Sequence, residues 1–171
     1  TAKYYTDFLA HESCGKCVPC REGLRQMLRI LTDITQGRGK ADDIELLEEL
    51  GKFMSDASLC ALGSTAANPV LSTIERFREE YEAHINEKRC PARACKAMIS
   101  YHIDPERCIN CKLCIKNCPT DAIEIEDDTH VIIQERCIKC GVCENVCPDK
   151  AKAVVRRDAE PVEHPCCAAA V

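Results

Sequence analysis

The chain of 171 residues contains no tryptophan, and aromatic residues make up only 4% of it. Proteins that hold single-stranded nucleic acid usually stack its bases on aromatic rings. The formal net charge of −5 also opposes binding to a phosphate backbone. We therefore expect no nucleic-acid partner.

Other absences bear on location and on cofactors. No apolar run approaches the roughly 18 residues of a candidate membrane helix, and no signal-peptide pattern opens the chain. We therefore expect a cytoplasmic protein without membrane contact. The chain lacks a glycine-rich phosphate loop, so neither FMN nor NAD(P) can be assigned to any of its residues. It begins with Thr1 rather than Met, and both the carboxyl part of a longer polypeptide and a processed piece fit this start.

Cysteine, by contrast, is abundant, with 16 residues in the chain. At this share either a disulfide scaffold or a metal protein has to be considered. Most of the cysteines are separated by two residues, a spacing that favours metal-bound thiolates over disulfides. Reduced thiolates in turn indicate a reducing compartment.

Two runs of the form C-x2-C-x2-C-x3-C-P lie in the second half of the chain. The first comprises Cys108, Cys111, Cys114 and Cys118, followed by Pro119. The second comprises Cys137, Cys140, Cys143 and Cys147, followed by Pro148. This is the run of bacterial ferredoxins, in which three cysteines hold one [4Fe–4S] cube and the fourth ligates the other cube.

This crossed rule divides the eight cysteines into two ligand sets. Cluster one takes Cys108, Cys111, Cys114 and Cys147. Cluster two takes Cys137, Cys140, Cys143 and Cys118. A pair of zinc sites is the alternative, because zinc also accepts four cysteines, but the doubling of the complete run disfavours it. The flanking sequence repeats as well, with Ala122 matching Ala151 and Ile125 matching Val154.

A third set of cysteines lies near the start of the chain. Cys14, Cys17 and Cys20 stand in the segment Glu-Ser-Cys-Gly-Lys-Cys-Val-Pro-Cys-Arg-Glu-Gly. Three cysteines on one loop need a fourth ligand, and Cys60 in Ser-Leu-Cys-Ala-Leu-Gly is a candidate. The alternative is that Cys60 is a structural residue buried in the core.

Both segments resemble the cluster domain of the NADH-oxidising, flavin-bearing subunit of respiratory complex I and its soluble relatives. This resemblance assigns Cys14, Cys17, Cys20 and Cys60 to a [4Fe–4S] cluster on a helical bundle. It also supplies a precedent for a cluster motif followed by helices. Three clusters are then expected in the chain.

The order of the modules narrows the set of proteins that the chain resembles. A bundle, then Cys-Pro-Ala-Arg-Ala-Cys-Lys-Ala, then two ferredoxin runs is similar to the carboxyl end of the β subunit of soluble NAD(P)-linked [FeFe] hydrogenases and formate dehydrogenases. The similarity covers residues 5–155. It implies an electron relay between flavin, partner-subunit clusters and ferredoxin, and several members bifurcate electrons. FMN and NAD(P) would bind upstream or on a partner, so this chain would be the electron-transfer portion of an oxidoreductase without a catalytic site of its own.

The expected fold class is α+β, a small helical bundle with one cluster followed by a bacterial-type double-cluster ferredoxin module. Apolar residues at helical spacing predict helices over 1–13, 21–36, 43–54 and 69–85, with Asp42 or Asp43 and Asn68 as caps. Short strands are expected at 123–125 and 131–133. The expected domains are a bundle at 1–88, a connector at 89–104, a ferredoxin-like domain at 105–158 and a disordered tail at 159–171.

Some histidines and cysteines remain outside the three cluster sets. His84, Cys90 and Cys95 could hold zinc, which takes four N or S donors, and thus form a hinge between the two cluster-bearing parts. His102, a tail cysteine or another chain could supply the fourth donor. The alternative is a polar helix end with two free thiols.

The other residues carry weaker signals. Cys166 and Cys167 are expected to be free thiols, His11 to be a surface or packing residue, and His130 and His164 to have no role. Lys112, Lys116 and Lys139 are either solvated or a docking surface for acidic ferredoxin. One other function class stays open, a non-redox module in which bound metal only staples a protein-interaction surface.

Overall fold

The computed structural model describes residues 1–126 and 129–159 of the chain. The chain divides into two compact units, residues 1–91 and 92–171, and each is described by itself. None of the described helices is both long and apolar enough to cross a membrane. Apart from residue 159, the predicted disordered tail, with His164, Cys166 and Cys167, lies outside the described residues.

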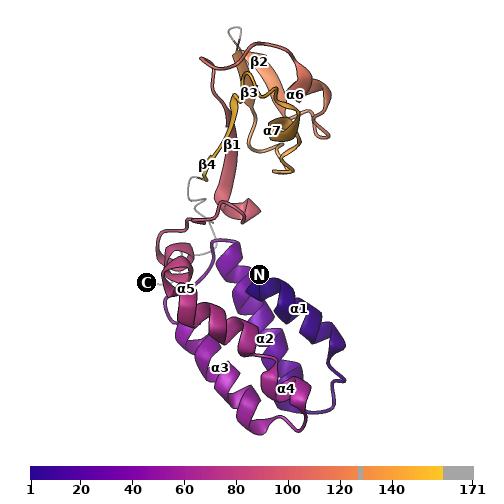
Figure 1. Cartoon of the computed structure of the whole chain (residues 1–171), viewed down its shortest axis with the longest axis vertical. Coiled ribbons are helices and arrows are strands. Elements are labelled where there is room, and N and C mark those ends of the chain that lie inside the picture. The colour runs from indigo at the N-terminus through magenta and orange to yellow at the C-terminus, as the bar shows by residue number, and fades with distance from the viewer. Residues whose placement is uncertain (127–128, 160–171) are drawn as a thin grey trace, which may run out of the picture. The chain divides into compact units, whose positions relative to one another are not determined.

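The first unit is helical (Figure 1). Its helices are α1 (Ala2–Glu12), α2 (Val18–Thr35), α3 (Asp43–Ala57), α4 (Ala61–Thr65) and α5 (Asn68–Asn86). The four helices expected from the apolar spacing are therefore present. The short helix α4 lies where the sequence predicted only a loop.

The helix starts differ in detail from the prediction. Asp42 immediately precedes α3, but its side chain makes no capping hydrogen bond. The Asp43 carboxylate instead accepts a hydrogen bond from the Lys40 backbone N–H at 2.8 Å. Asn68 is the first residue of α5 rather than its cap, and Pro69 lies in the first turn, where a missing N–H has no cost. Inside α5, Phe77 has φ −134° and ψ 36°, which kinks the helix.

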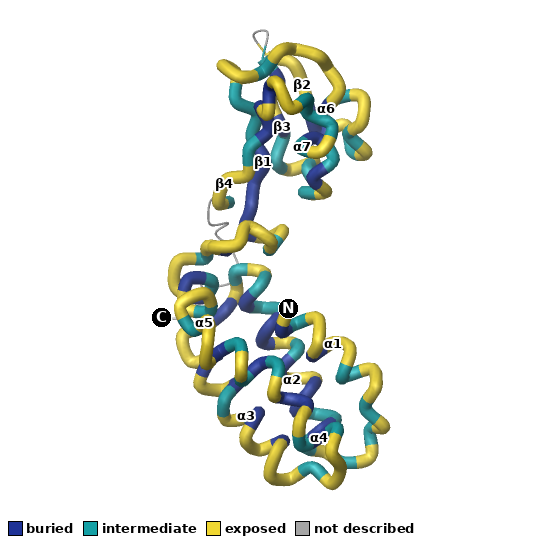
Figure 2. The backbone as a smooth tube through the Cα atoms, in the orientation of Figure 1, coloured by how far each residue is buried: buried dark blue, intermediate teal, exposed yellow. Residues whose placement is uncertain are grey.

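Helix α2 supplies the central wall of the bundle, because it packs against each of the other four helices. Its inward face and those of α3 and α5 bury a continuous apolar core (Figure 2), which includes Leu24, Met27, Leu31, Leu47, Met54, Val70 and Ile74. Burying each such side chain contributes about 1.5–3 kcal/mol. The bundle is thus held by ordinary hydrophobic packing.

The described part of the second unit contains two small antiparallel sheets and two short helices. Strand β1 (Ile99–Ile103), preceded by a 3₁₀ turn at Lys96–Met98, pairs with β4 (Val154–Asp158). Strand β2 (Ile123–Glu126) pairs with β3 (Thr129–Ile132). The helices are α6 (Leu113–Lys116) and α7 (Val142–Val146). The predicted strands are β2 and β3, whereas β1 lies inside the segment predicted to be a connector.

The internal repeat is visible in the backbone. Each ferredoxin run has two residues with positive φ, Asn110 and Lys112 in the first and Lys139 and Gly141 in the second. Each run then enters its short helix directly after the second of these residues. These left-handed turns curl the chain so that the cysteines on either side face the same interior.

The match of Ala122 with Ala151 is wrong. The backbone N–H of Ala122 donates to Cys118 Sγ at 3.4 Å, and the equivalent donor to Cys147 Sγ, at 3.3 Å, is Ala153. The carbonyls of Ala122 and Ala153 also accept equivalent bonds, from Ile133 and Asp104. The second half of the repeat therefore has two extra residues after Pro148, which an ungapped comparison of the sequence cannot register.

Candidate functional site

The two ferredoxin runs line two small cavities that are partly open to solvent. The cysteines that line the first cavity are Cys108, Cys111, Cys114 and Cys147. Those that line the second are Cys118, Cys137, Cys140 and Cys143. Each cavity thus receives three cysteines from one run and the fourth from the other run, which is the grouping that the crossed rule describes.

Apolar side chains complete the walls of both cavities. Ile103, Ile109 and Val154 line the first cavity. Ile123, Ile132 and Ile138 line the second. Ile109 and Ile138 each follow the first cysteine of their run and stay more than half exposed, at 58% and 57%. These two side chains mark the outer side of each cavity, where Cys111 and Cys140 are also exposed.

Burial and backbone hydrogen-bond donors shift the pKa values of the thiols in opposite directions. Burial raises the pKa of Cys143 to about 11 and also raises the pKa of Cys114. At Cys118 burial likewise opposes ionisation, but backbone hydrogen bonds from Thr120 and Ala122 outweigh it and lower the pKa. At neutral pH the Cys143 thiol is therefore protonated in the metal-free protein, and metal binding must release that proton.

The geometry of these eight cysteines fits a body larger than a single ion. Zinc holds sulfur at about 2.3 Å, so its ligands must converge on one point. Within the described part of the chain, the one group of three or more metal-binding side chains that converges in this way contains none of the eight cysteines. They instead lie around two cavities, four cysteines to each. This arrangement favours a cube over the zinc alternative raised by the sequence.

The cysteines of the first unit lie at helix starts. Cys17 is the N-terminal cap of α2, Cys20 is buried in its first turn, and Cys60 is the N-terminal cap of α4. Unpaired N–H groups at the start of a helix favour negative charge. Cys14 and Cys60 are exposed, so the alternative of a structural Cys60 buried in the core is wrong.

Two contacts bring the Cys60 loop against the first motif. A hydrogen bond from the backbone of Leu59, next to Cys60, is the main cause of a lowered pKa at Cys17. A Cβ atom on Gly63 would lie only 3.2 Å from the Cβ of Cys20 and 2.6 Å from that of Ser58. The absence of a side chain at Gly63 therefore lets the loop that carries Cys60 approach Cys20.

Polar contacts hold the loop of the first motif in place. The Arg21 guanidinium donates to the Gly15 carbonyl at 2.6 Å, and Gly15 has a φ of 72°. The Gly15 N–H donates to Ser13 Oγ, and that oxygen lies 3.3 Å from Cys20 Sγ. Hydrogen bonds within residues 13–21 thus hold this segment in place around its three cysteines.

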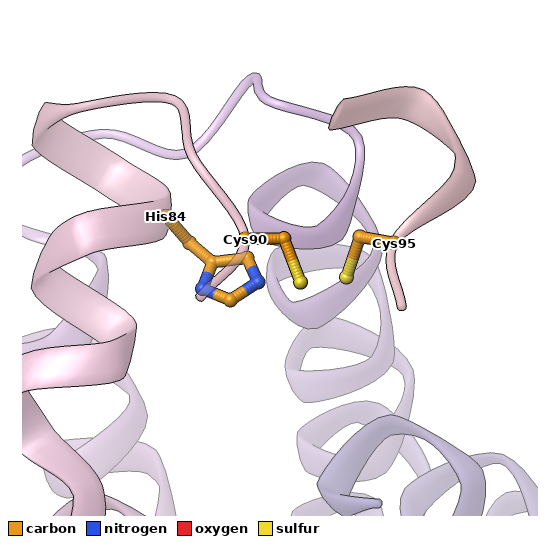
Figure 3. Close-up of side chains that lie close together, drawn as sticks. All are labelled: His84, Cys90 and Cys95. Carbon is orange, nitrogen blue, oxygen red and sulfur yellow. The ribbon is translucent and has the colours of Figure 1, made fainter. Parts of the chain in front are cut away.

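A separate group of possible metal ligands is formed by His84, Cys90 and Cys95 (Figure 3). Their ligand atoms all lie within 4.8 Å of one another. The His84 Nδ1 lies 2.6 Å from the Glu80 carbonyl, so Nδ1 carries the proton of the neutral ring and Nε2 carries the lone pair that a metal would use. Three soft or borderline donors at this spacing fit zinc.

The other candidate residues do not join that group. His102 lies in β1 with its Nε2 2.9 Å from Ser100 Oγ, and it is not one of the converging ligands. His11 is exposed and its Nδ1 lies 2.8 Å from the Asp7 carbonyl, as expected of a surface residue. His130, to which the sequence assigned no role, is buried in the wall of the first cavity. In the sequence, the feature that could have drawn attention to His130 is its position shortly before the second run.

Comparison with known families matches both units. Residues 1–84 match the NADH-ubiquinone oxidoreductase-F iron-sulfur binding region. Residues 100–158 match the 4Fe-4S dicluster domain, a range that begins inside β1. The chain is thus an iron–sulfur protein with two 4Fe–4S-binding domains.

Particular relatives carry similar sequences within redox complexes. The NADP-reducing hydrogenase subunit HndC of Solidesulfovibrio fructosivorans is 46% identical over 122 residues, 71% of this chain and 25% of the relative. An NADH-quinone oxidoreductase subunit of Streptomyces coelicolor is 47% identical over 87 residues, 51% of this chain and 19% of the relative. A solved NAD+-reducing [NiFe]-hydrogenase in the H2-reduced state is 36% identical, with a TM-score of 0.48, over 50% of this chain and 15% of that one. The chain spans a quarter or less of the length of these relatives.

We predict that Gly63→Ala disturbs the first motif, because the new Cβ would collide with Ser58 and press on Cys20. Thermal unfolding should show a loss of about 1–3 kcal/mol, as for other overpacked sites, and the Cys17 thiol should become more accessible to alkylation. Gly51→Ala is the matched control, because its nearest neighbours are the Leu71 Cγ and Cδ atoms, at 2.9–3.1 Å, rather than atoms of the cysteine motif. Equal effects of the two substitutions on alkylation of Cys17 would contradict the role given to Gly63.

Proposed function

We propose that the chain is an electron relay of three [4Fe–4S] clusters within a soluble NAD(P)-linked hydrogenase or formate dehydrogenase complex. The observation that carries the proposal is the division of eight cysteines between two cavities, three from one run and one from the other in each. The matches of both units to 4Fe–4S-binding domains support the same conclusion. A bound [4Fe–4S] cube would accept and release single electrons at each site.

The proposed ligand sets follow the cavities and the bundle loop. Cys108, Cys111, Cys114 and Cys147 would hold cluster one, and Cys137, Cys140, Cys143 and Cys118 would hold cluster two. Cys14, Cys17, Cys20 and Cys60 would hold the bundle cluster, supported by the Leu59 and Gly63 contacts. The crossed ligands Cys118 and Cys147 connect each run to both sites, which favours transfer between the sites.

The chain's own residues would tune these sites. The isoleucine and valine side chains would shield part of each site from water, and lower solvent exposure changes the potential of a cluster. The backbone N–H groups of Ala122 and Ala153 donate to the crossed thiolates, and such donors stabilise their negative charge. The start of α2 does the same for the bundle site through Cys17 and Cys20.

We also propose the cofactors and partners with which the chain exchanges electrons. FMN and NAD(P) would bind to a region upstream of this chain or to a partner, since the chain spans only 25% of HndC. Other subunits of a cytoplasmic hydrogenase or formate dehydrogenase complex, and ferredoxin, would exchange electrons with it. Electron bifurcation is a property that such a complex can have as a whole.

We also propose that His84, Cys90 and Cys95 bind one structural zinc ion. Zinc has no second accessible oxidation state, so the ion would not carry electrons. It would fix the local fold of the segment that carries its three ligands. The hydrogen bond from His84 to Glu80 supports the assignment, because bonds of this kind orient the rings of ligating histidines in zinc proteins.

The first test is the metal content. We predict about twelve irons and twelve acid-labile sulfides per chain after anaerobic reconstitution, falling to about eight in Cys60→Ala, because each cube holds four irons. Absorption and EPR spectra should show reducible clusters. A colourless protein, or one whose metal cannot be reduced, would instead fit a non-redox interaction module.

The second test addresses the crossed ligation. We predict that Cys118→Ala impairs the cluster of Cys137, Cys140 and Cys143, and that Cys147→Ala impairs the cluster of Cys108, Cys111 and Cys114. EPR of the reduced proteins should show selective loss of a different signal in each variant. Loss of the cluster belonging to the same run would exclude crossing.

The third test addresses zinc. We predict about one zinc per chain by elemental analysis, its loss in the double variant Cys90→Ser, Cys95→Ser, and unchanged iron. His102→Ala serves as the control and should keep its zinc, since His102 lies outside the converging group. A native protein without zinc would contradict the assignment.

A further inference from the structure

The two halves of the ferredoxin repeat differ at one pair of equivalent positions. Tyr101 on β1 and His130 on β3 each lie seven residues before the first cysteine of the following run. Both side chains are buried, with 3% of each exposed. One half of the module therefore carries a phenol ring where the other carries an imidazole.

His130 faces the cysteines of the first cavity. Its Nδ1 lies 3.6 Å from Cys108 Sγ and 3.7 Å from Cys114 Sγ, within hydrogen-bonding range of sulfur. Its Nε2 is buried without a hydrogen-bond partner in the described part of the chain. The imidazole thus has two polar contacts, and both are to sulfurs proposed to bind the same cluster.

Iron ligation decides the direction of these hydrogen bonds. A thiolate bound to iron has no proton, so Cys108 and Cys114 can only accept. Nδ1 must then carry the hydrogen of a neutral ring. The opposite tautomer would place an N–H in the buried, unpartnered position of Nε2, where it would cost more than an unpaired acceptor lone pair.

Tyr101 makes different contacts beside the second cavity. Its hydroxyl oxygen lies 3.0 Å from the position that a Cβ atom on Gly141 would take. The Arg156 guanidinium lies 5.8 Å from the centre of its ring and is paired with Glu144 at 2.6 Å. Within residues 1–126 and 129–159, the Tyr101 hydroxyl has no hydrogen bond to a cysteine sulfur. Among the described residues, the second cavity thus has no imidazole against its sulfurs, but one longer side-chain contact, from Thr120 Oγ1 to Cys118 Sγ at 3.8 Å.

We propose that His130 is a positioning residue that donates an N–H···S hydrogen bond to the thiolates of the first cavity and makes its cluster easier to reduce than that of the second. The inference rests on the cluster assignment made above. Reduction adds negative charge that spreads onto the thiolates, so a donor stabilises the reduced form more than the oxidised form. The electron would then reside preferentially on the cluster of the first cavity, so electron transfer through the module would have a preferred direction.

The test measures the reduction potentials of the full holo chain by redox titration followed by EPR. We expect His130→Phe to lower one midpoint potential and leave the others in place. The electron distribution between the two cubes should change on the order of tenfold, about 59 mV for a one-electron couple. Tyr101→Phe is the matched control, and no potential should move by a comparable amount, because the lost hydroxyl makes no hydrogen bond to a sulfur of the described residues. His130→Gln keeps an N–H donor, so the affected midpoint potential should lie between those of the wild type and of His130→Phe.

A second measurement needs no variant. In wild-type protein with ¹⁵N-labelled histidine, pulsed EPR of the reduced chain should show a nitrogen coupled to one cluster. Unchanged potentials in His130→Phe with full iron content, an equal shift in Tyr101→Phe, or no histidine coupling would overturn the role of His130 while leaving the relay intact. A wild-type chain without reducible cubes would instead overturn the relay itself.

Discussion

The second unit depends on the placement of cysteine sulfur around two cavities. The sheets β1–β4 and β2–β3 are each only two strands wide, and such small sheets are marginal without something to pack on. The apolar side chains that they bury face cavities lined by thiols rather than a continuous hydrocarbon core. Clusters that bind there would therefore contribute to folding as well as to function.

The fold of the first unit is stabilised in a different way. Its core consists mostly of leucine, isoleucine and methionine side chains, joined by Cys20 and flanked by Cys17, and the cluster motif lies where α2 and α4 begin. Loss of a ligand there should leave the bundle folded. In the second unit ligand and core are the same residues, since Cys114 and Cys143 are buried among the apolar side chains.

Thiols take two arrangements in the described part of the chain, and each favours a different metal. The eight cysteines of the ferredoxin runs are spread around two cavities. The ligand atoms of His84, Cys90 and Cys95 converge within 4.8 Å. A cube holds its ligands apart, whereas a single ion draws them together, so the distance between donors is the basis for proposing a different metal at each.

The sequence alone determined the cysteine sets, the helices of the bundle, strands β2 and β3 and the grouping of His84, Cys90 and Cys95, because spacing and periodicity are local properties. Only the tertiary structure decided that β1 pairs with β4 from the far end of the unit, a pairing that no local pattern encodes. It also decided that Ala153 rather than Ala151 is equivalent to Ala122. Likewise, His130 gained a role only when β3 brought it to two sulfurs of the other run, because a side chain's chemistry depends on its neighbours in space.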